Sequence, residues 1–165
     1  MKQLYIDFDG VILNTVNFMN KDIEDLKIQD DFEKKEEYYK NIDWDKMISQ
    51  SSEINNSIEN IKKLIESKFF NISILTHMNS LEELIYKTKF IRKSIKEIPI
   101  IGVPKVFKKP QMVNAKDAIL VDDRIENIID WKSSGGIAIQ FLPDKKTDLN
   151  INEINNLEQL IEIFK

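Results

Sequence analysis

The sequence contains no cysteine and a single histidine, His77, among its 165 residues. Without cysteine the chain can form no disulfide, no thiolate metal site and no cysteine nucleophile. One histidine is too few for a zinc site built on imidazoles, and a Ser-His-Asp triad would have to use His77 itself. The chemistry of this protein therefore depends on carboxylates, hydroxyls and amines.

Glycine is also scarce, and none of the four glycines forms the glycine-rich turn after a first strand that dinucleotide-binding folds use. No apolar run approaches the roughly 18 to 20 residues of a membrane span. The first residues lack the basic start and small-residue cleavage site of a signal peptide, because Asp7 and Asp9 interrupt them. We therefore expect a cytoplasmic protein with no membrane association. Its net charge of −4 also argues against duplex nucleic acid as a partner.

Short runs of β-branched and aliphatic residues alternate with helical patterns. The runs cover residues 3–8, 70–76, 98–103, 117–123 and 136–142. They are almost continuously apolar, which is typical of parallel strands buried on both faces. Between the second and third runs a set of residues shares one face of a helix: Leu81, Leu84, Ile85, Thr88 and Ile91. The pattern predicts an α/β fold, a doubly wound, Rossmann-like parallel sheet.

One interval lacks strands. Residues 14–68 show only charged helical periodicity, and this stretch is too long for an ordinary crossover after the first strand. We predict a core domain formed by residues 1–13 and 69–165, with 14–68 as a small, all-helical cap. Such a cap would lie over the carboxyl ends of the strands, where ligands bind in this architecture. A helical extension without a role in binding is the alternative.

Polar side chains follow the first four expected strands. They are Asp7 and Asp9, then Thr76, then Lys105, Lys108 and Lys109, then Asp122 and Asp123. Because the carboxyl ends of parallel strands meet at one edge, these groups should share one crevice. Four carboxylates repel one another unless a cation lies among them, and oxygen ligands favour Mg²⁺. A magnesium ion, a lysine and a hydroxyl together suit a phosphate dianion.

The segment DFDGV, the strand-terminal Thr76, a lysine after the third strand and LVDD resemble the four ordered motifs of the haloacid dehalogenase (HAD) superfamily. By this resemblance, Asp7 is the nucleophile that forms an aspartyl-phosphate. Asp9 is the general acid and base, and its backbone carbonyl binds the metal. Thr76 holds a phosphoryl oxygen, Asp122 is a direct Mg²⁺ ligand, and Asp123 binds the ion through water or orients its ligands.

The lysine of the third motif has three candidates. Lys109 is preferred as the phosphate-binding residue, because it directly precedes the PQMV segment that leads to the fourth strand. Its neighbour Lys108 is the second candidate, and Lys105 lies close by.

The segment LVDDRIENIIDWKSSGGIAIQF resembles the fourth-motif region of 5′(3′)-deoxyribonucleotidases and their bacterial relatives. The resemblance implies a phosphatase for nucleoside monophosphates. We expect a monomer or a homodimer. Aromatic residues of the cap could stack on a base or could pack its small core: Phe18, Tyr38, Tyr39 and Trp44. Another small phosphorylated metabolite, such as a sugar phosphate, is the alternative substrate. A catalytically weak, phosphate-binding regulatory protein is the alternative function.

Overall fold

The computed structural model describes residues 1–145 and 151–165, so residues 146–150 of the predicted core lie outside the described chain. Within the described residues there are six strands: β1 (Lys2–Ile6), β2 (Phe70–Met78), β3 (Ile100–Pro104), β4 (Ile119–Asp122), β5 (Ile137–Phe141) and β6 (Glu153–Ile154). The helices of the same residues are α1 (Thr15–Asp25), α2 (Phe32–Lys40), α3 (Trp44–Gln50), α4 (Ser57–Ser67), α5 (Leu81–Arg92), α6 (Lys109–Met112), α7 (Ile125–Ser133) and α8 (Gln159–Phe164).

All neighbouring strands run parallel, in the order β3-β2-β1-β4-β5-β6. This arrangement confirms the predicted doubly wound α/β fold, and the five apolar runs of the sequence form β1 to β5. The strand β6 was not expected. The tail EINNLEQLIEIFK has an amphipathic pattern that predicts a closing helix, but its first residues form β6, which pairs with the edge of β5, and α8 begins only at Gln159.

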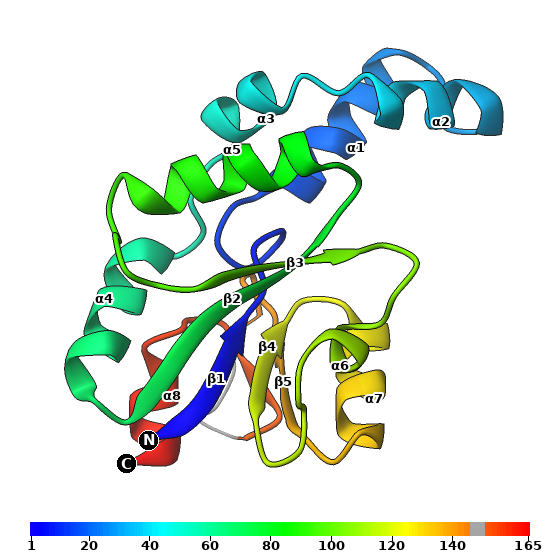
Figure 1. Cartoon of the computed structure of the whole chain (residues 1–165). Helices are drawn as coiled ribbons and strands as arrows, with labels where there is room; N and C mark the ends of the chain where they lie inside the picture. Colours follow the sequence, from blue (N-terminus) through cyan, green and yellow to red (C-terminus); the bar gives the residue numbers. More distant parts are fainter. Residues whose placement is uncertain (146–150) are drawn as a thin grey trace.

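Each face of the sheet carries its own apolar core, because successive side chains of a strand point to opposite faces. Leu4 and Ile6 of β1 pack on the face that α4, α5 and α8 cover. Tyr5 packs on the opposite face, against Trp131 of α7. Figure 1 shows α4 and α8 on one side of the sheet and α6 and α7 on the other. The near-continuous apolar pattern of the strands follows from this double coverage.

The helices between β1 and β2 have two different surroundings. The helices α1, α2 and α3 lie together beyond one end of the sheet, next to α5 (Figure 1). By contrast, Ile58, Ile61 and Leu64 of α4 belong to the same buried cluster as the sheet residues Leu4 and Ile72. The division of the chain into a core and a cap over 14–68 stays a prediction. No helix among the described residues is long and apolar enough to cross a bilayer.

The strand register brings the carboxyl ends of β1, β2 and β4 together. Ile6 of β1 is paired with Ile74 of β2 on one side and with Val121 of β4 on the other. The backbone N–H of Asp7 then donates to the Val121 carbonyl at 2.9 Å. As a result, Asp7 lies at the level of Asp122, the last residue of β4.

The packing of α4 makes a prediction for stability. Ile61 is fully buried among sheet residues, whereas Ile65 on the same helix is 43% exposed. We expect Ile61→Ala to lower the free energy of unfolding by about 2–5 kcal/mol, because it leaves a cavity in the core. Ile65→Ala is the matched control, with an expected loss below about 1 kcal/mol. Urea unfolding curves measure both, and equal losses would show that α4 does not stabilise the core.

Candidate active site

Lys109 lies at the centre of the carboxylate edge. The side chain comes from the first turn of α6, is completely buried, and places Nζ 2.7 Å from Asp7 Oδ1 and 2.5 Å from Asp122 Oδ2. Burial alone lowers the pKa of Lys109, but the two carboxylates outweigh it and raise that pKa above its ordinary value. Burial raises the pKa of Asp7 well above its usual range, although Lys109 opposes this shift.

Asp122 is held by a second set of donors. Its Oδ1 accepts from the backbone N–H of Arg124 at 3.0 Å, and Nδ2 of Asn127 lies 2.9 Å from each carboxylate oxygen. Asn127 belongs to the first turn of α7, which begins directly after β4. The carboxylate is therefore fixed in orientation by three residues, although it is fully buried.

Asp123 packs against the glycine of DFDGV. Gly10 has a φ of +74°, and a Cβ atom built there would lie 2.3 Å from Asp123 Oδ2. Both the backbone conformation and the close approach of Asp123 therefore require glycine at this position. Burial, followed by the charge of Asp122, raises the pKa of Asp123 to about 7.

The acidic residues fit a divalent cation. Carboxylate oxygens of Asp7, Asp122 and Asp123 all lie within 4.8 Å of one another. Asp123 Oδ1 is buried, and within the described part of the chain no donor lies at hydrogen-bonding distance from it. A buried carboxylate oxygen without a donor is costly, and a hard cation with oxygen ligands would satisfy it. These three residues, all in the predicted metal set, could hold such an ion.

Asp9 points into the same site but has different partners. Its Oδ1 accepts from the Thr15 hydroxyl at 2.7 Å, and its Oδ2 lies 2.5 Å from Lys87 Nζ and 3.4 Å from Thr76 Oγ1. Burial raises the pKa of Asp9, but the charge and hydrogen bond of Lys87 and the bond from Thr15 outweigh it, so the pKa is lowered. Asp7 and Asp9 thus have pKa values shifted in opposite directions, two residues apart.

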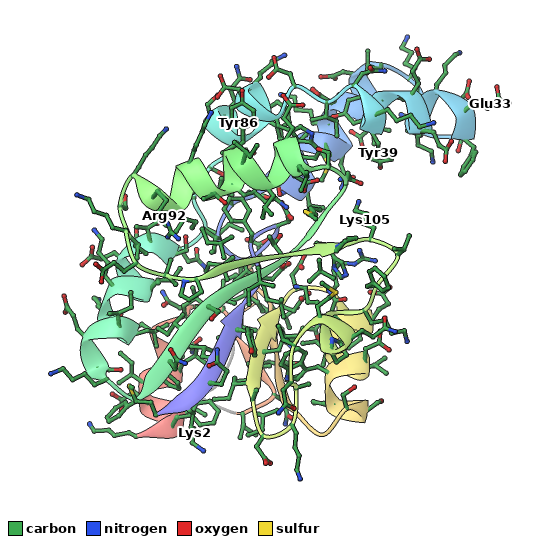
Figure 2. The ribbon with its side chains drawn as sticks, viewed as in Figure 1. Lys2, Glu33, Tyr39, Tyr86, Arg92 and Lys105 are labelled. Atoms are coloured by element: carbon green, nitrogen blue, oxygen red, sulfur yellow. The ribbon has the colours of Figure 1, made fainter. Side chains whose placement is uncertain are left out.

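The structure separates the three lysines of the third motif. Lys109 alone contacts the carboxylates. Lys108 points away and forms an exposed ion pair with Asp130 of α7, with 2.6 Å between Nζ and Oδ1. Lys105 extends toward α2, where its Nζ lies 5.8 Å from the centre of the Tyr39 ring. In Figure 2 the labelled side chains of Lys105 and Tyr39 face each other.

Two adjoining cavities open at this edge. The inner one, about 100 Å³, is lined by the acidic residues Asp7, Asp9 and Asp123 among others. The outer one, about 520 Å³, lies between α2, α3 and the start of α5, with Tyr39 and Ser80 in its wall. Three residues line both cavities: Trp44, Asn79 and Lys105. A ligand could therefore place a phosphate near the acids and extend toward Tyr39.

Two of the other cap aromatics have different surroundings. The Tyr38 hydroxyl donates to Asp22 Oδ2 at 3.2 Å, which ties α2 to α1. Phe18 is half-buried on α1 and does not line the inner or the outer cavity. His77 lines the inner cavity with its Nε2 3.1 Å from the Phe107 carbonyl, and burial lowers its pKa. Because a carbonyl oxygen only accepts, Nε2 carries a proton and donates it to Phe107.

Sequence reasoning missed Lys87, Glu83, Asn127 and Thr15. The expected apolar face of α5 is wrong at two positions, because Leu81 and Ile85 are 70% and 52% exposed, whereas Glu83 and Lys87 are buried. These two charged residues are four apart and 2.6 Å separates Lys87 Nζ from Glu83 Oε1. Their spacing is that of an ordinary surface ion pair, so the pattern alone does not reveal their burial.

The fold is that of HAD-superfamily hydrolases. The chain superposes on a HAD-superfamily hydrolase of subfamily IA, variant 1, from Geobacter sulfurreducens with a TM-score of 0.64 and 12% identity, covering 98% of each chain. For a family IA, variant 3 HAD hydrolase from Entamoeba histolytica the TM-score is 0.61 and the sequence identity 13%, with 98% of this chain and 100% of that one covered. A third similar structure is D,D-heptose 1,7-bisphosphate phosphatase from B. bronchiseptica, complexed with magnesium and phosphate. Its TM-score is 0.58 and its sequence identity 13%, with 98% of this chain and 97% of that one covered. No model of a known family and no curated protein matches the sequence.

Gly10 supplies a test of the metal-binding geometry. We expect Gly10→Ala to lower the melting temperature because the new Cβ displaces Asp123. If Asp7, Asp122 and Asp123 hold Mg²⁺, the substitution should also abolish most of the stabilisation that the ion gives. Gly135→Ala is the matched control: its φ is +83°, but the nearest atom to a new Cβ is 3.9 Å away. The control should lose about 1–2 kcal/mol through backbone strain and keep the Mg²⁺ effect. Thermal unfolding with and without Mg²⁺ measures both, and the same Mg²⁺-induced shift in the two variants would contradict the prediction.

The raised pKa of Asp123 predicts how stability changes with pH in EDTA. The folded protein keeps this proton up to about pH 7, whereas the unfolded chain releases it near 3.8. Between these values the unfolded state binds fewer protons, so this residue makes the free energy of unfolding fall as pH rises. We expect Asp123→Asn to remove that contribution and flatten the profile from about pH 4 to 7. Denaturant titrations across this range test it, and parallel profiles for both proteins would rule it out.

Proposed function

We propose that the protein is a Mg²⁺-dependent phosphomonoester hydrolase that acts through an aspartyl-phosphate. The observation that carries this proposal is one inner cavity lined by Asp7, Asp9 and Asp123, with Lys109 bridging Asp7 to Asp122 beside it. Thr76 lies within reach of Asp9 at the same edge. This set provides a nucleophile, a proton carrier, a fixed positive charge and a hydroxyl donor.

In the proposed first step, a carboxylate oxygen of Asp7 attacks phosphorus and the bond from phosphorus to the leaving oxygen breaks. The leaving oxygen takes a proton from the Asp9 carboxyl. In the second step, Asp9 takes a proton from a water molecule, and the water oxygen attacks the phosphorus. The bond to Asp7 then breaks, which releases phosphate and restores protonated Asp9. Thr76 and Lys109 hold the phosphoryl oxygens and balance their charge through both steps.

Asp9 has to be protonated in the first step and ionised in the second. Lys87 and Thr15 favour the ionised form in the free protein. A bound phosphate dianion adds negative charge beside Asp9 and favours the protonated form. The bound substrate thus favours the protonated Asp9 of the first step, and Lys87 and Thr15 favour the ionised Asp9 of the second.

Asp7, Asp122 and Asp123 would hold the metal, together with the Asp9 carbonyl that the family resemblance implies. A bound Mg²⁺ would offset the repulsion among the carboxylates and polarise the phosphoryl group. Lys109 is the cation that lies within ion-pair distance of Asp7 and Asp122 among the described residues. A divalent cation would add positive charge where Asp7, Asp122 and Asp123 come together.

A nucleoside monophosphate is the substrate that we favour. The support is the outer cavity, whose wall carries the aromatic rings of Tyr39 and Trp44 next to the entrance of the inner one. A base could stack on these rings, since stacking requires only an aromatic face. The amide of Asn79 and the ammonium of Lys105 line both cavities and offer polar contacts to a sugar.

A sugar phosphate is the second candidate. It is favoured by the small volume of the inner cavity and by the similarity of the fold to a heptose bisphosphate phosphatase. A catalytically weak, phosphate-binding regulatory protein would use the same cation, lysine and hydroxyl without turnover.

Phosphate release tests the proposal. Wild-type protein is incubated with deoxyribonucleoside, ribonucleoside and sugar monophosphates, with Mg²⁺ or with EDTA. We expect release in Mg²⁺ only, fastest from nucleotides, and a loss of about 10³-fold or more in Asp7→Asn because the nucleophile is gone. Asp130→Asn is the control, since this carboxylate pairs with the exposed Lys108 and does not line the inner cavity.

The ranking within the panel separates the candidates. Faster release from sugar phosphates would replace the nucleotide assignment and keep the mechanism. Equal activity of Asp7→Asn and wild type would remove Asp7 as the nucleophile. Binding of phosphate and Mg²⁺ without release from any ester would favour the regulatory alternative.

A further inference from the structure

Lys87 is a fully buried charged residue that the proposed reaction leaves without a role. It lies on the second turn of α5, and its ammonium group contacts four acceptors. These are Asp9 Oδ2 at 2.5 Å, Glu83 Oε1 at 2.6 Å, Thr76 Oγ1 at 3.0 Å and the His77 carbonyl at 3.0 Å. Burial lowers its pKa, but Asp9 and Glu83 outweigh this and raise the pKa above its ordinary value. The group is therefore charged.

The contacts of Lys87 argue against a direct role in binding phosphate. An ammonium group has three donors, and four acceptors already compete for them. Lys109, which the family resemblance assigns to phosphate binding, is equally buried. Among the described residues its ammonium group contacts two carboxylate oxygens, of Asp7 and Asp122, so a third donor remains for a phosphoryl oxygen.

We propose that Lys87 is a positioning residue that fixes the orientation of Asp9 and Thr76 for proton transfer and phosphoryl binding. Lys87 and Thr76 contact Asp9 Oδ2, whereas Oδ1 has only Thr15 as a hydrogen-bond partner among residues 1–145 and 151–165. Oδ1 therefore keeps a lone pair for the proton that passes to the leaving group and returns from water. The effect of Lys87 on turnover rests on the proposed function. The placement of Asp9 by Lys87 does not depend on that function.

Lys87 also sets the direction of the Thr76 hydroxyl. Because Thr76 Oγ1 accepts from the ammonium group at 3.0 Å, its own proton points elsewhere. In the free protein that proton faces the His77 carbonyl at 3.1 Å or Asp9 Oδ2 at 3.4 Å. A phosphoryl oxygen would offer a stronger acceptor, since hydrogen bonds to charged groups are stronger than neutral ones.

Glu83 holds Lys87 from the other side. Its Oε2 accepts from the backbone N–H of Asn79 at 2.6 Å and from the Asn79 side chain at 2.9 Å. The backbone N–H of Glu83 donates to Ser80 Oγ, which caps α5. The ammonium group is thus fixed by the first turn of α5, and its position does not depend on the ligand.

The leaving group of the substrate provides the test. An alkyl phosphate needs a proton on its departing oxygen, whereas 4-nitrophenyl phosphate releases a stable anion without one. The variant is Lys87→Met combined with Glu83→Gln, which avoids a buried unpaired carboxylate and keeps an acceptor for Asn79. The control is Lys89→Met on the exposed side of the same helix, where the ammonium group lies over the Tyr86 ring. Single-turnover rates are measured for both esters after circular dichroism confirms folding.

We expect the double variant to lose about 10²-fold on the alkyl ester and less than about tenfold on the aryl ester, because misplacing a general acid affects only the first strongly. Lys89→Met should match wild type on both. Equal losses on the two esters, or no loss, would overturn the inference while the proposed function stands.

A second measurement does not depend on turnover. The carboxyl-carbon NMR resonance of Asp9, assigned through Asp9→Asn, reports its hydrogen bonding in labelled protein. We expect it to shift in the Lys87 variant and to stay in place in Lys89→Met. If wild-type protein hydrolyses no ester, the proposed function fails, and this resonance still decides: a shift supports the placement of Asp9 by Lys87, and an unchanged resonance overturns it.

Discussion

The buried ammonium group of Lys109 is the contact on which the geometry of the acidic edge depends. It joins Asp7, after β1, to Asp122, at the end of β4, with distances of 2.7 and 2.5 Å. Two carboxylates this deeply buried and this close would repel each other without a cation between them. Because Lys109 comes from α6, the chain between β3 and β4 is fixed by the same contact. The strand pairing of β1 with β4 and this ion pair therefore support each other.

A second buried lysine gives the two aspartates of DFDGV different properties. Asp7 faces Lys109 and three other carboxylates, and its pKa is raised, chiefly by burial. Asp9 faces Lys87 and the Thr15 hydroxyl, and its pKa is lowered although it is buried too. Phe8, between them, is fully buried and points into the core, so the strand end sends both acids to the same side. In the free protein these directions favour a neutral Asp7 and an ionised Asp9, so the reaction that we propose needs a cation beside Asp7 to keep it ionised and a phosphate beside Asp9 to protonate it.

The fold and most of this edge could be predicted from the sequence, because parallel topology converts order along the chain into proximity in space. Positions near the carboxyl ends of strands, such as Thr76, two residues before the end of β2, and Asp122, the last residue of β4, needed no knowledge of side-chain packing. Lys87 did need it. The periodicity of α5 places Leu81 and Ile85 on an apolar face, and only the position of the helix next to Asp9 makes burial of Lys87 favourable. The short strand β6 was missed for a similar reason, since two residues carry no periodicity and its pairing with β5 is a tertiary contact.

The first two turns of α5 connect the outer cavity to Asp9. Asn79 and Ser80 line that cavity, and both also hydrogen-bond Glu83. Glu83 in turn fixes Lys87, which fixes Asp9. Since each of these contacts is already made in the free protein, the connection is a rigid support, of the kind that holds a catalytic group in its productive position. The burial of two charged residues on α5 therefore has a physical reason: the start of the helix lines the outer cavity, and its second turn places Lys87 against Asp9, the proton carrier of the reaction that we propose.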